Sequence, residues 1–188
     1  MRMHSLLNIL IDVIFEMGYL GFFFYMVIVG TFIPLPTQLI LLPAGYLASQ
    51  GKFDISTVVL ITALGTTVGA TINYHLANYI SKRFVSENKI YKIKKFFNKY
   101  GRLSVLLAPL TFGLGQYISL PAGMAKMELR WFLPLIFVSN AVWNFAMLML
   151  GYLFGENASS YVLYLVGGGT IFIIIIISSF VYREFKSY

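Results

Sequence analysis

The chain has 188 residues and no cysteine, and only 11% of its residues are charged. Without cysteine it can form no disulfide, no thiolate metal site and no cysteine nucleophile. Hydrolytic chemistry would then need another nucleophile with a base, or a metal held by histidines and carboxylates. Two histidines and seven acidic residues, most of them at the ends of apolar runs, form no recognisable cluster of that kind. We therefore expect no enzyme activity, no bound metal and no cofactor.

Apolar sequence is abundant, because 59% of the residues are hydrophobic. A helix of about 20 residues crosses a bilayer, and runs of that length recur along the chain. They predict an all-α polytopic membrane protein with about four transmembrane helices, over residues 6–33, 55–80, 131–154 and 161–182. Asp12 and Glu16 place the first half of the first helix at the membrane interface.

Two further apolar stretches, residues 34–50 and 103–125, are broken by proline and glycine. Basic residues collect on the cytoplasmic side of a membrane, so their distribution shows whether these stretches cross it. If both cross, six basic residues share one side and eight face the other. If both are re-entrant hairpins, thirteen of the fourteen share one side and Lys52 lies opposite. We therefore predict two re-entrant hairpins, one from each face, in a cell-membrane protein with both termini in the cytoplasm.

The two broken stretches share a repeated sequence. QLILLPAG at residues 38–45 returns as QYISLPAG at residues 116–123, and a basic-aromatic pair follows each at the same offset, beginning at Lys52 and Arg130. Related segments that enter from opposite faces form an inverted repeat, which is typical of secondary transporters with a site near the membrane midplane. The alternative is that two proline-broken helices merely pack in the bundle and that their sequence match is due to chance.

Proline and glycine give the repeat its expected geometry. Proline has no backbone N–H to donate and clashes with the preceding turn, so Pro43 and Pro121 are expected to break their helices. Gly45 and Gly123 permit a tight turn or a close backbone approach. Irregular backbone at membrane depth must be enclosed by protein or line a wet cavity. The hairpins therefore predict a cavity. A continuous helix through Pro43, or Gln38 and Gln116 lying far apart, would end the inverted-repeat argument.

Several features together resemble the DedA family, whose members share the SNARE-associated or VTT domain. The resemblance covers roughly residues 30–155 and rests on the paired hairpins with P-x-P, the two A-G dipeptides, G-x-x-x-G followed by tyrosine (Gly65, Gly69, Tyr74), residues 99–102 and Trp143. It implies movement of lipids between leaflets. In bacteria the implied lipid is undecaprenyl phosphate, and in eukaryotes the implied activity is phospholipid scrambling.

The chain departs from the family in its charged residues. Relatives commonly carry an acidic residue in the first hairpin and two arginines in the second, for proton coupling and phosphate contact. Here the acidic position falls on Gln38, and the arginine positions fall on or beside Pro109 and Gly115, next to Gln116. We expect Gln38 and Gln116 to hydrogen-bond to each other or to line the cavity, and we expect no proton-driven step.

The candidate cavity also includes Pro34 and Pro36 and the polar span residues Asn73, His75, Asn140 and Asn144. Interhelical hydrogen bonds are the structural alternative for these polar residues. His75 is also a candidate proton carrier, although a lone histidine is more often a packing residue.

A basic segment, residues 82–102, has apolar residues at helical spacing between lysines. It is expected to lie as an interfacial helix on the anionic leaflet, or alternatively to be a loop that only fixes topology. Nucleic-acid binding is not expected, because the membrane accounts for the charge. The G-x-x-x-G of Gly65 and Gly69 is a weak dimerisation signal, so homo-oligomerisation stays open.

These observations divide the chain into an N-terminal interfacial or transmembrane helix (residues 1–29), a DedA-like core (30–155) and a C-terminal helix with a short tail (156–188). The predicted function is a lipid translocase or scramblase for polyprenyl phosphate or phospholipid. A small-solute transporter and a non-transporting membrane organiser are the alternatives.

Overall fold

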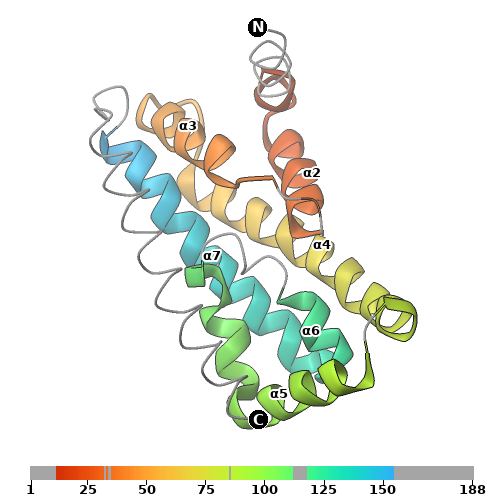
Figure 1. Cartoon of the computed structure of the whole chain (residues 1–188). Helices are drawn as coiled ribbons and strands as arrows, with labels where there is room; N and C mark the ends of the chain where they lie inside the picture. The colour runs from red at the N-terminus through yellow and green to blue at the C-terminus, as the bar shows by residue number, and fades with distance from the viewer. Residues whose placement is uncertain (1–11, 32, 34, 85, 112–117, 155–188) are drawn as a thin grey trace, which may run out of the picture.

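The computed structural model describes residues 12–31, 33, 35–84, 86–111 and 118–154. Within these ranges the regular elements are helices (Figure 1), as the sequence predicts. They are α2 (Tyr19–Gly30), α3 (Gln38–Ser49), α4 (Ile55–Phe84), α5 (Glu87–Leu107), the 3₁₀ helix η1 (Ala108–Thr111), α6 (Ser119–Met124) and α7 (Leu129–Phe154). The expected span over residues 161–182 lies outside the described residues.

The long helices α4 and α7 form the centre of the fold and carry the two predicted central spans. Their apolar stretches, Ile55–Ala77 and Leu129–Phe154, are only 39% and 28% buried. Most of their apolar surface therefore faces outward, unlike the core helix of a soluble protein. On α4, exposed apolar residues from Leu60 to Tyr79 cover about 28 Å at 1.5 Å per residue. That length matches the hydrocarbon core of a bilayer, about 30 Å thick.

The expected continuous helix over residues 6–33 is wrong in the described part. Gly18 has φ 58° and ψ −132°, a conformation that only glycine adopts at low cost, and α2 begins after it. The chain folds back so closely that a Cβ atom on Gly21 would lie 2.1 Å from the carbonyl oxygen of Ile14. The apolar character is uniform across Gly18, so hydropathy gave no sign of this turn.

The expected break at Pro43 is also wrong, because α3 continues from Gln38 to Ser49 with Pro43 inside it. The chain breaks earlier, between α2 and α3, where Thr31 is extended. Residues 35–50 therefore do not form a hairpin of their own. The chain turns back between α2 and α3, and these two helices are called the first hairpin below. A helix through Pro43 removes the proline argument for the repeat, so an inverted relation between the halves needs independent support.

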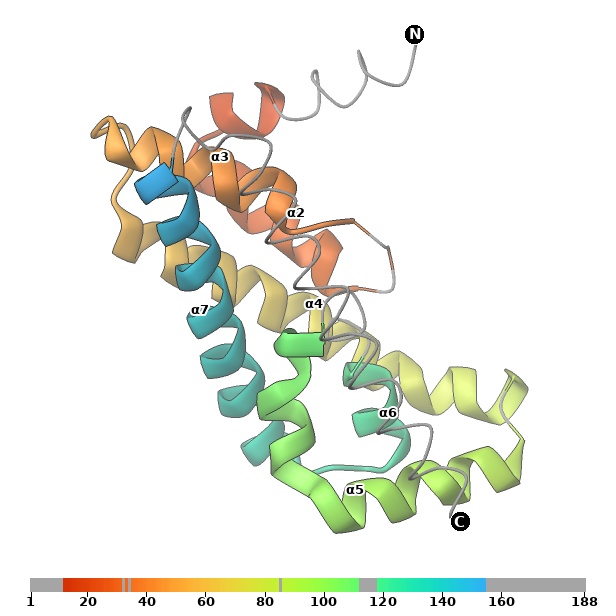
Figure 2. The ribbon, with the colours of Figure 1, turned by 60° about the vertical axis from the view of Figure 1, so that its left-hand side comes forward.

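The second broken stretch forms short elements. α5 bends at Gly101 (φ 41°, ψ −114°), and its last turns lead into η1. Pro121 lies in the first turn of α6, a position that tolerates proline. The residues before Ile118 lie outside the described residues, so the expected break at Pro121 stays a prediction. Before Gly101, α5 lies across one end of the bundle (Figures 1 and 2). There Phe97, only 7% exposed, packs against the protein core.

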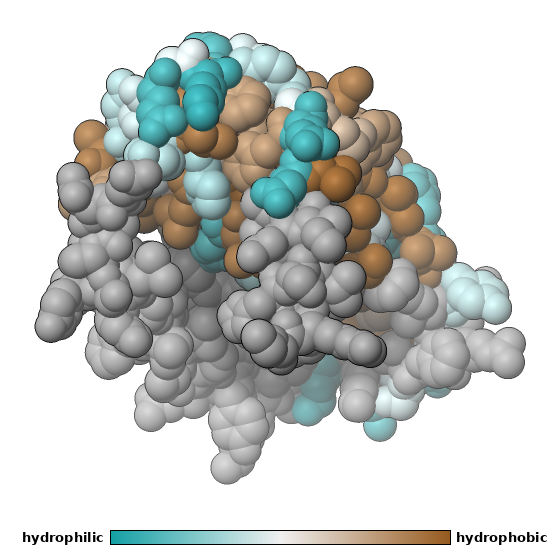
Figure 3. All heavy atoms as spheres, turned by 90° about the horizontal axis from the view of Figure 1, so that it is seen from above, coloured by the Kyte–Doolittle hydropathy of each residue, from teal (hydrophilic) through white to brown (hydrophobic). Residues whose placement is uncertain are grey.

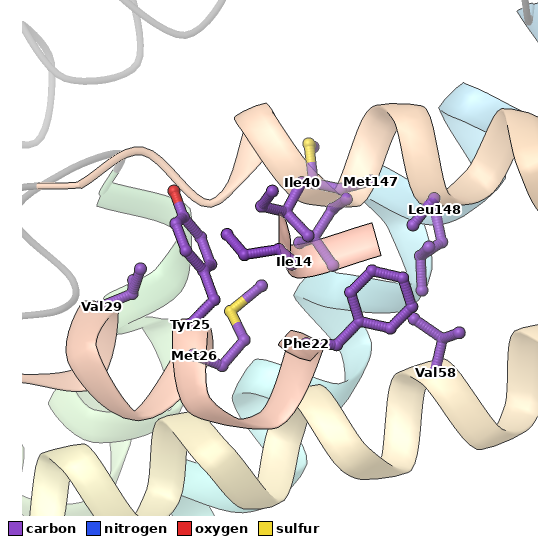
Figure 4. Packing of buried hydrophobic residues seen from close by; sticks show 11 residues of the cluster. Ile14, Phe22, Tyr25, Met26, Val29, Ile40, Val58, Met147 and Leu148 are labelled. Carbon is purple, nitrogen blue, oxygen red and sulfur yellow. The ribbon is translucent and has the colours of Figure 1, made fainter. Parts of the chain in front are cut away.

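Two hydrophobic clusters hold the helices together. The first joins α2, α3, α4 and α7 (Figure 4) and includes Phe22, Met26, Leu41 and Leu148. The second joins α4, α5, α6 and α7 around Tyr74 and Phe132, whose ring centroids are 5.1 Å apart. Each cluster therefore lies at a different end of the α4–α7 pair.

Candidate functional site

The two repeated glycines make reciprocal contacts between the halves of the chain. A Cβ atom on Gly45 of α3 would lie 2.1 Å from the Leu148 oxygen and 2.9 Å from the Tyr152 nitrogen of α7. A Cβ atom on Gly123 of α6 would lie 2.4 Å from the Tyr74 oxygen of α4. The same 78-residue shift relates Gly45 to Gly123 and Tyr74 to Tyr152. Each hairpin helix thus packs on the long helix of the other half.

The turn glycines add a second correspondence between the halves. Gly18 precedes α2 with φ 58° and ψ −132°, and Gly101 precedes the last turns of α5 with φ 41° and ψ −114°. In both halves a helical segment is followed by a sharp bend at glycine, then by two short helical segments and one long helix. The short segments are α2 and α3 in the first half, and the last turns of α5 together with α6 in the second. Sequence reasoning missed both bends, and a glycine beside an aromatic residue could not have revealed them, because Gly45-Tyr46 and Gly151-Tyr152 lie inside regular helices.

The helices that carry the repeated glycines also end alike. After α3, the N–H of Lys52 donates to Leu47 at 3.0 Å and that of Gly51 to Ala48 at 3.0 Å. After α6, the N–H of Met127 donates to Ala122 and that of Lys126 to Gly123, both at 3.0 Å. Each pattern is a Schellman motif, with a left-handed residue at Gly51 (φ 76°) or Lys126 (φ 57°).

The G-x-x-x-G sequence of α4 holds α2. A Cβ atom on Gly65 would lie 2.5 Å from the Phe23 oxygen, and one on Gly69 would lie 2.2 Å from the Val27 oxygen. A Cβ atom on Gly30, at the end of α2, would likewise lie 2.5 Å from the Thr66 oxygen. These glycines therefore serve helix packing within one chain, and they provide no support for a dimer.

The tip of the first hairpin is held by Tyr25, whose hydroxyl donates to the Pro36 carbonyl at 2.9 Å. Gln38 is the first residue of α3 and is half-buried, with the Thr37 hydroxyl 3.4 Å from its Oε1. Pro36 is exposed, and Pro109 is half-buried in η1. Pro34, Gly115 and Gln116 lie outside the described residues, so the Gln38–Gln116 hydrogen bond stays a prediction.

The polar residues of the spans take different roles. Buried Asn144 of α7 donates from Nδ2 to the Thr62 hydroxyl of α4 at 3.1 Å, which is the expected interhelical bond. Asn73 of α4 donates to the Gly30 carbonyl of α2 at 3.2 Å. Asn140 donates to Ile136 of its own helix at 2.7 Å. His75 is exposed on α4.

Asn73 has a further feature, because its side chain is 0% exposed while Oδ1 has no hydrogen-bond partner. Among the buried side-chain atoms of the described residues, no other polar atom is left unpaired. A buried acceptor without a donor costs about 1–3 kcal/mol. The orphan acceptor lies beside the tip of the first hairpin, since Asn73 contacts the last residue of α2.

Charge separates the two ends of the described bundle. Lys52 lies at one end with Asp12, Glu16 and Asp54, whereas ten other basic residues lie in the last turn of α4, in α5 and around the start of α7. At that basic end the Arg102 guanidinium lies over the Trp131 ring, 3.5 Å from its centroid. Arg130 also forms an ion pair with Glu128.

The sequence of this chain matches a known protein family. The VTT domain matches residues 35–153, which is more than half of the chain. The chain belongs to the VTT-domain (DedA) family. It is therefore a membrane protein, as its outward apolar helices indicate.

Several curated relatives match the chain over similar shares of both sequences. An "Alkaline phosphatase-like protein" of Lactococcus lactis subsp. cremoris is 29% identical over 164 residues, 80% of this chain and 77% of that protein. Proteins named "Undecaprenyl phosphate transporter A" are 26% identical in Staphylococcus aureus, over 77% of both chains, and 26% identical in Bacillus subtilis, over 82% of this chain and 81% of that one. No solved structure matches significantly.

The hairpins of this VTT-domain protein are electrically neutral. Residues 19–49 and 103–125 contain no Asp, Glu, Lys, Arg or His. The described residues also contain no group of three or more histidine, cysteine or acidic side chains that could hold a metal ion. Chemistry at the hairpins must therefore use amides, hydroxyls and backbone groups.

Proposed function

We propose that the protein moves a polyprenyl phosphate between membrane leaflets without proton coupling, through a site between its two hairpins. The observation that carries this proposal is the reciprocal packing of Gly45 on α7 and Gly123 on α4. It supports an inverted repeat on grounds independent of the prolines, and such repeats place substrate near the midplane. The relatives named as undecaprenyl phosphate transporters supply the lipid class.

The length of the first hairpin supports a re-entrant path. α2 begins beside α4, where the Asp54 N–H donates to the Tyr19 hydroxyl at 3.0 Å. It has 12 residues, about 18 Å of helix, which is too short for a core of about 30 Å. Gly30 then lies against Thr66, part-way along α4. α3 leads back to Lys52, so the hairpin enters and leaves at one end.

The hairpin tip can hold a phosphate without a cation. Backbone that leaves a helix at mid-depth must be enclosed by protein or face water. α3 starts there with no acidic residue in its first turn and no side-chain cap. The start of a helix carries partial positive charge, and the Gln38 side-chain amide can donate to an anion there. The N–H groups of Leu39 and Ile40 already donate to the carbonyls of Pro36 and Thr37, at 3.3 and 3.2 Å. In this proposal, neutral donors replace the arginines of relatives.

The missing ionisable groups predict the energetics. A carboxylate that binds a proton can couple lipid movement to a pH gradient, but a glutamine cannot. With Gln38 at the acidic position and no Asp, Glu, His, Lys or Arg in residues 19–49 and 103–125, the proposal has no carboxylate or imidazole to carry a proton inside the hairpins. Movement should then follow the lipid gradient alone.

The first hairpin divides its contacts between the two halves. α2 packs on α4 through Gly65 and Gly69, while α3 packs on α7 through Gly45 and Gly151. A small rotation of α7 relative to α4 would therefore separate the arms at the tip. We propose this motion as the step that opens the site.

The orientation follows from the charges. The end with α5 would face the cytoplasm, because basic residues collect on that side. The exposed Lys94 and Lys95 of α5 would then contact the anionic leaflet. The apolar side of α5 packs partly on the protein through Phe97, so this contact would be chiefly electrostatic. Asp12 and Glu16 would then lie at the outer face beside Lys52, so we do not carry over the expected cytoplasmic N-terminus. We keep the cytoplasmic C-terminus and the three-part division of the chain as part of the proposal.

Leaflet exchange in proteoliposomes tests the function. A labelled polyprenyl phosphate and a labelled phospholipid are compared, with and without a pH gradient. The wild type should move the polyprenyl phosphate equally in both conditions. Gln38→Leu should slow exchange by about tenfold or more, the effect of losing about 1.4 kcal/mol.

Gln50→Leu is the matched control, because it makes the same change at the exposed far end of α3. It should leave the exchange rate unchanged. Exchange that requires the gradient would contradict the uncoupled mechanism. Absence of lipid movement in the wild type would contradict translocation itself, and movement of phospholipid alone would contradict the substrate class.

A further inference from the structure

A cleft lies at the end of the bundle opposite α5, away from the hairpin tip. Its volume is about 410 Å³, and it is lined by Asp12, Phe15, Glu16, Leu47, Lys52 and Phe53. Figure 3 views the molecule from this end, where hydrophilic patches stand beside apolar surface. The cleft thus combines charged and apolar walls where residues 12–16 meet the end of α3.

Aromatic rings form its apolar part. Phe53 is the centre of the group, with its ring centroid 5.0 Å from that of Phe22, 5.6 Å from that of Tyr19 and 6.3 Å from that of Phe15. The Phe15 and Phe53 rings are partly exposed and line the cleft, so they offer aromatic surface to a ligand.

Charges of both signs surround this aromatic surface. Asp12 and Glu16 are four residues apart on one helical turn, so their carboxylates lie on one side. Lys52 is fixed nearby by the Schellman motif that ends α3. Within the described residues none of the three has an ion-pair partner. A mixed-charge rim in which the charges do not pair with one another can accept a ligand that carries both signs.

The corresponding ring in the other half lies against a cation of the protein. Lys52 and Phe53 correspond to Arg130 and Trp131 in the repeat. There, the guanidinium of Arg102 covers the Trp131 ring at 3.5 Å. In the first half Phe53 instead borders the open cleft, and among the residues that the structure describes no cation lies over its ring. The ring equivalent to Phe53 in the second half, that of Trp131, thus already has a cation over its face.

We propose that this cleft binds a zwitterion whose ammonium group lies over the aromatic surface between Asp12 and Glu16 and whose anionic group contacts Lys52. Aromatic faces attract ammonium groups, and carboxylates form strong charge-assisted hydrogen bonds with them. Lys52 can bind a phosphate as a point charge. The ligand can be an amine-bearing phospholipid headgroup at the leaflet surface or a small soluble zwitterion. The site is separate from the proposed translocation site.

Calorimetric titration of the full chain in detergent tests the proposal with three soluble probes: ethanolamine, phosphoethanolamine and glycerol phosphate. Phosphoethanolamine should bind best. The double variant Asp12→Asn, Glu16→Gln should weaken its binding by about tenfold or more. Lys52→Gln should weaken phosphoethanolamine but leave ethanolamine unchanged. Glu128→Gln, at the opposite end, is the matched control and should change nothing.

The same variants in nanodiscs separate the two sources of the ligand. If phosphatidylethanolamine competes with soluble phosphoethanolamine and phosphatidylglycerol does not, the site binds the lipid headgroup. Competition by neither lipid would assign it to a soluble zwitterion. Equal affinity in the wild type and the double variant, or no binding of phosphoethanolamine by a folded wild type, would overturn the proposal. Polyprenyl phosphate exchange by the double variant should remain at the wild-type rate.

Discussion

Gly45 and Gly151 meet where α3 crosses α7, and each leaves room for the backbone of the other helix. A Cβ atom on Gly45 would lie 2.1 Å from the Leu148 oxygen, and one on Gly151 would lie 2.1 Å from the Leu42 oxygen. A methyl group on either side cannot fit without moving a backbone. The crossing therefore depends on glycine in both helices.

Gly45→Ala should lower the free energy of unfolding by about 1–3 kcal/mol, the usual cost of overpacking. Thermal unfolding in detergent, followed through loss of monodisperse protein, measures the change. Gly51→Asn is the control, because a Cβ atom on Gly51 meets no atom within 4 Å and asparagine tolerates positive φ. An unchanged stability in Gly45→Ala would show that α3 does not pack on α7 in this way.

A double-mutant cycle of Asn144→Ala and Thr62→Val should give a coupling free energy of about 0.6–1.7 kcal/mol. The physical reason is the 3.1 Å bond between the Asn144 amide and the Thr62 hydroxyl, which joins α7 to α4. Both side chains are buried, at 1% and 0% exposure, so water cannot replace the lost partner. Additive effects of the two substitutions would place the residues apart.

Lys126→Gly should stabilise the protein by about 1 kcal/mol, because a side chain in the left-handed region costs that much. Lys126 has φ 57° and occupies the position that glycine takes after α3, at Gly51. Lys126→Gln is the control for the lost charge and should not stabilise. A loss of stability in Lys126→Gly would show that its side chain makes a contact worth more than the strain.

The start of α4 predicts a pH dependence. Hydrogen bonds from the side chain and backbone N–H of Thr57, at 2.6 and 2.8 Å, hold the pKa of the Asp54 carboxyl below its usual 3.8. A group whose pKa is lowered by folding stabilises the fold above its unfolded pKa and loses that contribution as the pH falls through its folded pKa. The contribution should thus be complete above pH 3.8 and fade below it.

Comparing unfolding of the wild type and Asp54→Asn across this pH range measures the effect. Asparagine can still cap the helix but carries no charge, so its stability should not show this acid-dependent component. Identical pH profiles would contradict an ionised Asp54 at the helix start. Glu128→Gln provides a comparison for loss of an exposed acid elsewhere.

The sequence was sufficient for features encoded locally or by composition. The all-helical class, the two long apolar helices and the helix over residues 87–100 follow from periodicity and hydropathy. The interhelical bonds of Asn73 and Asn144 follow from the need to satisfy amides inside a bundle. Features that rest on contacts far apart in sequence, such as Gly45 against α7, were not visible.

Two errors have physical causes. The Gly18 turn was missed because apolar residues continue on both sides of it, so hydropathy has no boundary there. Pro43 was expected to break its helix because local propensity disfavours proline. Packing of α3 against α7 overrides that preference, and the break moves to the segment before Gln38. Of the two Schellman motifs, only the one at Gly51 could have been predicted, because glycine favours a left-handed conformation. Lysine does not, so the sequence gives no sign of the motif at Lys126.

Single-cysteine labelling in intact cells tests most directly whether the first hairpin returns to the face that it enters. The chain has no cysteine, so Glu16→Cys, Gln50→Cys and Asn98→Cys each introduce one thiol. A membrane-impermeant maleimide should label the Glu16 and Gln50 positions from outside the cell. The Asn98 position should react only after permeabilisation. Labelling of the Glu16 and Gln50 positions from opposite faces would contradict the re-entrant hairpin and, with it, the inverted arrangement of the two halves.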